Sequence, residues 1–62
     1  MTYDVLEVDI ASGEVVGVMA QDKDERNAEA VMKMAVIRRG VEHSIYVTVP
    51  SGTKSIGDTW GD

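Results

Sequence analysis

The sequence predicts a single α+β domain over residues 1–50, followed by a C-terminal tail over residues 51–62. Three observations predict this fold class. Two β-prone stretches flank a short turn that ends in glycine, and a third stretch with alternating apolar residues ends at a proline. Between the second and third stretches lies a segment with an acidic start and a glycine stop, which is typical of a helix. The expected order is therefore strand, strand, helix, strand.

Residues 3–10 form the first expected strand, because apolar and polar residues alternate along them. One side carries the residues that we assign to the core, Leu6, Val8 and Ile10. The other side carries Tyr3, Val5, Glu7 and Asp9. The loop 11–13 leads into the second strand, residues 15–20, and its final glycine suits a bulged hairpin turn. Same-face apolar residues meet across this hairpin if Leu6 pairs with Val18, Val8 with Val16 and Ile10 with Glu14.

The helix is expected to begin at Asp22 or Asp24, either of which can cap it, and to end near Arg39. Gly40 is expected to stop it in a left-handed conformation. At 100° per residue the helix carries two apolar stripes. The first stripe is rich in alanine and suits close packing on a sheet: Ala28, Val31, Met32 and Ala35. The second stripe is surplus to that packing: Ala30, Met34 and Ile37.

The last expected strand begins at His43 or Ser44 and runs to Val49, and Pro50 ends it. The first strand runs up, the second runs down, and the helix returns up. The third strand then runs down, antiparallel to the first. The sequence therefore predicts an antiparallel sheet in the order 2-1-3 with one helix on one face. The opposite face is expected to be open and to carry Tyr3, Val5, Glu7, Asp9, Val15, Gly17, Met19, Tyr46 and Thr48.

The composition narrows the function classes. The chain has 62 residues, a net charge of −5, no cysteine and one histidine, which excludes disulfides and thiolate metal sites. We expect no metal, no cofactor and no enzymatic activity. The acidic balance disfavours nucleic acid and anionic membranes, and no apolar run approaches the roughly 18 residues of a membrane helix. The absence of cysteine and of a signal-like N-terminus favours a cytoplasmic location.

A small domain without disulfides or metals is usually stabilised by oligomerisation. The surplus helix stripe is the best candidate for the contact, so we expect self-association through Ala30, Met34 and Ile37, most simply as a homodimer. The alternative is that Ile56 and Trp60 of the tail fold back over the stripe within one chain.

The open sheet face, together with the tail tryptophan, is the candidate partner-binding surface. It combines aromatic, apolar and acidic groups, which suits a basic protein partner. The expected contact residues are Tyr3, Val5, Glu7, Asp9, Met19, Tyr46 and Trp60. For Trp60 the alternative is that it anchors the tail on its own domain or on a second copy.

These observations favour a small non-enzymatic protein-interaction module, an adaptor or an inhibitor. Small acidic proteins of phages and mobile elements share this size and charge, which is an analogy only. The alternative function is a dimeric nucleic-acid-associated regulator that uses Arg38 and Arg39. A calcium loop beginning at Asp22 is not expected, because Arg26 and Lys33 fall where ligands are needed.

Overall fold

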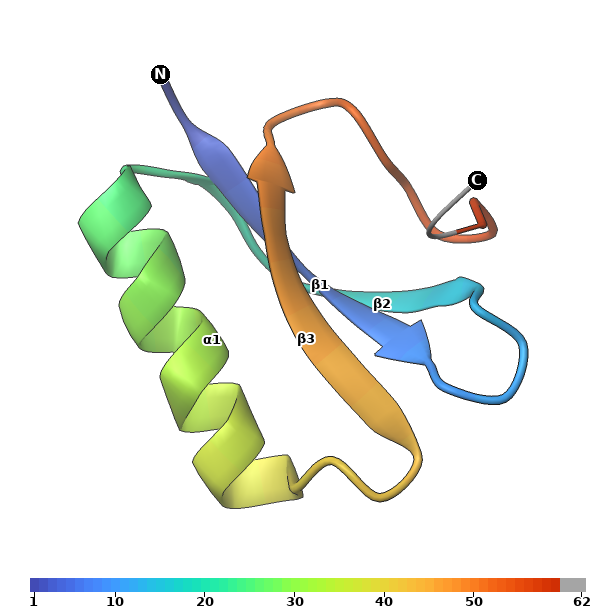
Figure 1. The fold of residues 1–62 in the computed structure, drawn as a ribbon. Helices are drawn as coiled ribbons and strands as arrows, with labels where there is room; N and C mark the ends of the chain where they lie inside the picture. The colour runs from blue at the N-terminus through green and yellow to red at the C-terminus, as the bar shows by residue number, and fades with distance from the viewer. Residues whose placement is uncertain (60–62) are drawn as a thin grey trace.

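The computed structural model describes residues 1–59, and it confirms the predicted α+β fold (Figure 1). Strands β1 (Tyr3–Asp9), β2 (Val15–Lys23) and β3 (Ser44–Pro50) form one antiparallel sheet in the order β2-β1-β3. Helix α1 (Glu25–Arg39) joins β2 to β3 and packs against the sheet. The expected order of elements and the expected order of strands are both confirmed.

The ends of α1 follow the expected capping chemistry. Asp24 is the N-cap, and its carboxylate accepts a hydrogen bond of 2.8 Å from the backbone N–H of Asn27. Gly40 ends the helix with φ of +74°, a conformation that L side chains rarely adopt, and its N–H donates to the carbonyl of Val36. Of the two caps that the sequence allowed, Asp24 is the one used. Asp22 lies one residue before the end of the longer β2 strand.

The helix covers the face of the sheet that the sequence analysis expected to be open. Val5 and Tyr46 are buried there together with Ala28 and Ala35 of α1. The expectation of an open face is therefore wrong for Val5 and Tyr46. It is also wrong for Val15, which is buried with Leu6 and Val8 on the opposite face. The physical reason is that both faces of β1 carry apolar residues, so alternation separates the two faces without saying which one the helix covers.

The other face holds the second half of the core, where Leu6, Val8, Val15 and Val49 are buried together. The segment after β3 turns back along this face (Figure 1). Its start bonds to the Asp4 carboxylate, and further on Gly57 N–H donates to the carbonyl of Val15. The sheet is thus covered on one side by α1 and on the other by residues 51–58.

The hairpin register differs from the prediction near its turn. Leu6 pairs with Val18 as expected, but Val8 pairs with Val15, because a bulge shifts the register by one residue. Val16 is consequently 47% exposed. Ile10 leaves the strand for the turn and is 53% exposed, so its assignment to the core is wrong.

Candidate functional site

A hollow lies between α1 and β2. It is an open groove of about 450 Å³ that the helix borders from Ala30 to Arg39. Its lining is apolar except at one end, where two arginines lie. The lining residues are Met19, Ala30, Val31, Met34, Ala35, Arg38 and Arg39. The geometry offers no acid–base pair and suits the burial of apolar side chains.

Two of the three residues predicted for self-association line this groove, Ala30 and Met34. Met34 is 45% exposed, and Ile37 is 77% exposed one helical turn further along the same stripe. Among the described residues, the tail follows the other face of the sheet, so residues 51–59 do not cover this stripe. We call Met19, Ala30, Met34 and Ile37 the helix surface.

The residues predicted for partner binding are dispersed by the fold. Val5 and Tyr46 are buried beneath α1, and Tyr3 is half-buried at the start of β1. Met19 lines the groove and so joins the helix surface. Trp60 lies outside the described residues. The predicted set therefore does not form one open face.

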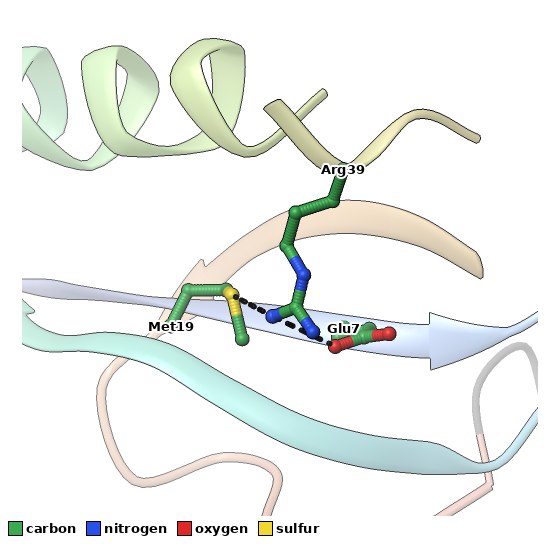
Figure 2. Close-up of polar contacts among 3 residues, drawn as sticks. All are labelled: Glu7, Met19 and Arg39. Atoms are coloured by element: carbon green, nitrogen blue, oxygen red, sulfur yellow. Dashed lines mark hydrogen bonds and ion pairs between the residues drawn. The ribbon is translucent and has the colours of Figure 1, made fainter. Parts of the chain in front are cut away.

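Glu7 and Arg39, which the sequence analysis placed in different candidate sites, contact each other (Figure 2). Arg39 reaches from the end of α1, and its Nη1 lies 3.5 Å from Oε1 of Glu7 and 3.4 Å from the sulfur of Met19. The acidic group expected to meet a basic partner is thus paired within the chain. So is one of the two arginines expected to meet phosphate. Arg38 makes no ion pair within residues 1–59 and remains the cation at this end of the groove.

A double-mutant cycle on this pair is expected to give a small coupling energy. The Arg39 side chain is 54% exposed, and exposed ion pairs contribute only about 0.2–1 kcal/mol. Urea unfolding of Glu7→Gln, Arg39→Gln and the double variant measures this coupling. A coupling of several kcal/mol would contradict the expectation and would identify the pair as a main support of the helix.

Asp9, also predicted to bind a partner, closes the hairpin turn. Its Oδ2 accepts hydrogen bonds from the backbone N–H of Ser12 at 3.2 Å and from the Ser12 hydroxyl at 2.8 Å. The carbonyl of Asp9 also accepts from Gly13, whose φ is +73°. Asp side chains commonly stabilise turns in this way. The carboxylate is therefore engaged in local structure.

The carboxylate that sequence reasoning missed is Asp4. It is only 5% exposed, and it accepts hydrogen bonds from Asp22 N–H at 3.1 Å, the Ser51 hydroxyl at 3.1 Å and Gly52 N–H at 3.2 Å. The Asp22 N–H has the largest effect and lowers the pKa of Asp4; burial opposes it, and the Gly52 and Ser51 donors lower the pKa further. The sequence did contain an indication of this role. Asp4 lies on the same side of β1 as Leu6, which was assigned to the core, and a buried carboxylate needs hydrogen-bond donors.

Asp4 links β1 to β2 and to the segment after β3, since its two carboxylate oxygens accept hydrogen bonds from both. Within residues 1–59, no group of three or more histidine, cysteine or acidic side chains is arranged to hold a metal ion. None of the described helices combines the length and apolar character needed to cross a membrane. Comparison with known proteins gives no match to a family model, to a curated protein or to a solved structure.

Proposed function

We propose that this protein is a non-enzymatic protein-interaction module that self-associates through the helix surface. The observation that carries the proposal is the continuity of exposed apolar side chains with an apolar groove. Ile37 is 77% exposed and Met34 is 45% exposed. Met34 also lines the groove, together with Ala30 and Met19. Contiguous apolar patches of this kind on small proteins usually mark contact sites.

The pattern along α1 suits a second copy of the same chain. Ala30 lies four residues before Met34 and Ile37 lies three residues after it, on one stripe of the helix. If two helices pack antiparallel about a two-fold axis near Met34, Ile37 of each copy meets the small Ala30 of the other. A two-fold contact of this kind uses the same patch on both copies, as most homodimers do.

The wider role that we propose is that of an adaptor or inhibitor. A self-associated pair carries two copies of every surface that lies outside the contact, and each copy can bind a partner. The absence of cysteine supports a cytoplasmic setting for it. The nucleic-acid alternative has less support, because Arg39 is paired with Glu7 and only Arg38 remains as an uncompensated cation at this end of the groove.

Light scattering on wild type and on Met34→Glu/Ile37→Glu tests the proposal. Charges at the centre of the contact are expected to halve the solution mass while the circular dichroism spectrum stays that of the folded chain, because both positions are exposed. Val36→Glu is the matched control, since Val36 is a 38% exposed apolar residue on the other flank of the same helix. An unchanged mass in the double variant would overturn the proposal. If the double variant does not fold, Ile37→Glu alone serves in its place.

A further inference from the structure

The two outer strands of the sheet are protected very differently. The pairing of β2 with β1 is interrupted by three register shifts, and the first residue of β2 is bonded to the segment after β3, where Val15 N–H donates to the carbonyl of Asp58. The pairing of β3 with β1 runs through seven consecutive residue pairs without a bulge. Within residues 1–59, no strand pairs with the outer edge of β3 (Figure 1).

The edge of β3 also lacks the side chains that normally discourage pairing. Its sequence, SIYVTVP, contains no charged residue, and its one proline stands at the end. Ile45 is 37% exposed and Thr48 is exposed along this edge. Natural proteins usually protect an edge strand with lysine, a bulge, a proline or a covering loop. A regular, uncharged edge of this length is therefore expected to be paired in solution.

The ladder to β1 determines which backbone groups face outward. At its two ends, Ile10 N–H donates to the carbonyl of His43 and Ser51 N–H donates to the carbonyl of Thr2, both at 3.0 Å. Hydrogen-bonded and non-bonded pairs alternate along an antiparallel ladder. Val47 and its neighbours of the same parity therefore bond to β1, and the outward N–H and carbonyl groups belong to Ser44, Tyr46 and Thr48.

We propose that the β3 strands of two copies pair antiparallel about a two-fold axis at Val47, which joins the two sheets into one. This register pairs the whole strand with itself. Tyr46 exchanges both backbone hydrogen bonds with Thr48 of the second copy, and Ser44 N–H donates to the carbonyl of its Pro50. Pro50 has no N–H to donate, so the ladder ends there.

The side chains are also self-complementary in this register. Val47 lies opposite itself, and Ile45 lies opposite Val49 of the second copy, so apolar residues meet on the Leu6 face of the sheet. On the helix face, the aromatic Tyr46 lies opposite the β-branched Thr48. Such cross-strand pairs stabilise sheets. A second copy of this chain therefore fits the edge without any unpaired charge.

This interface is separate from the helix surface and does not depend on it. Two different two-fold contacts on one chain give a closed tetramer when their axes cross at a right angle, and an open chain of dimers when the axes do not meet. With both contacts present we expect a wild-type particle larger than a dimer. Loss of either contact alone is expected to leave a dimer, and loss of both a monomer.

Thr48→Pro is the variant that tests the β3 contact. It deletes an outward N–H and leaves every hydrogen bond to β1 in place. Edge strands tolerate proline at positions whose N–H points away from the sheet. Thr48→Val is the matched control, because it keeps the backbone donor and the branched side chain. Thr48→Pro is expected to halve the solution mass, and Thr48→Val to leave it unchanged. If Thr48→Pro does not fold, Ile45→Lys at the same edge serves instead.

The masses separate this inference from the proposed function. A wild-type dimer that becomes a monomer with Thr48→Pro but is unaffected by Met34→Glu/Ile37→Glu supports β3 pairing and overturns association through the helix. The reverse pattern overturns β3 pairing, and so does a wild-type monomer.

A single cysteine tests the register directly, because the chain contains none of its own. Val47→Cys places two thiols opposite each other at a non-hydrogen-bonded pair, where the Cα atoms are about 4.5 Å apart and within disulfide reach. Mild oxidation is expected to convert most of the protein to a covalent dimer. Val16→Cys, 47% exposed on β2, is the control. Equal cross-linking of both variants would mean random collision and would overturn the register.

Discussion

A chain that ends at Pro50 is expected to lose cooperative folding. Residues 51–58 cover the face of the sheet on which Leu6, Val8, Val15 and Val49 are buried. Each re-exposed valine or leucine costs about 1.5–3 kcal/mol. A domain of this size has a total stability of about 3–9 kcal/mol, taking 0.05–0.15 kcal/mol per residue. Exposure of two or three of these side chains is enough to unfold it.

Thermal unfolding followed by circular dichroism measures this effect. The full chain is expected to show a sigmoidal transition, and the shortened chain a gradual, non-cooperative change. Ile56→Ser in the full chain is the control, because Ile56 is 65% exposed and surface changes usually stay within about 0.5 kcal/mol. A shortened chain that melts like the full one would mean that β1, β2, β3 and α1 suffice for the core.

Asp4→Ala is expected to reduce the free energy of unfolding by about 3 kcal/mol, since hydrogen bonds to charged groups contribute about 1.5–3 kcal/mol and three donors lose their acceptor. Those donors are Asp22 N–H, the Ser51 hydroxyl and Gly52 N–H. Asp4→Asn should cost less, because its remaining oxygen can still accept from Asp22 and Ser51. Urea unfolding at pH 7 measures both variants. Equal stability of Asp4→Ala and wild type would mean that water replaces the carboxylate.

The pH dependence follows from the direction of the pKa shift. The pKa of Asp4 is lowered in the folded chain, chiefly by the Asp22 N–H. The ionised carboxylate therefore stabilises the fold fully above the unfolded pKa of about 3.9, and this contribution is lost as the pH falls through the lower folded pKa. The stability difference between wild type and Asp4→Asn should shrink on acidification from pH 7 to pH 2. A constant difference would contradict this origin.

The sequence predicted the elements of this fold better than their orientation. Local chemistry determines both ends of the helix: the sequence predicted the stop at Gly40 and narrowed the cap to Asp22 or Asp24, of which Asp24 is used. The face covered by α1 could not be predicted in this way. The expected order makes β2 and β3 parallel, and crossovers between parallel strands are right-handed. That rule places the helix on one side of the sheet. Which side chains of β1 lie on that side depends on which residue pairs of the ladder are hydrogen-bonded, and an alternating sequence pattern does not reveal this.

The candidate site was predictable to the same degree. The exposure of Ala30, Met34 and Ile37 follows from helical periodicity and was predicted; their role in self-association stays a prediction. Met19 joins these residues only because α1 lies on the unexpected face. The Glu7–Arg39 pair and the donors to Asp4 link residues that are 32 and up to 48 positions apart. Contacts over such separations depend on the tertiary arrangement, which composition and spacing do not encode directly.

The return of the chain along the Leu6 face also has a consequence for biosynthesis. Asp4 emerges from the ribosome early, but two of its donors follow 47 and 48 residues later. The backbone groups of Val15 likewise form hydrogen bonds with residues 57 and 58, which are synthesised near the end of the chain. Contacts over long sequence separations slow folding. Until residue 58 has been synthesised, Leu6 and Val8 lack their cover, and the nascent chain presents them to chaperones and proteases. Incomplete translation products of this chain are therefore expected to be short-lived.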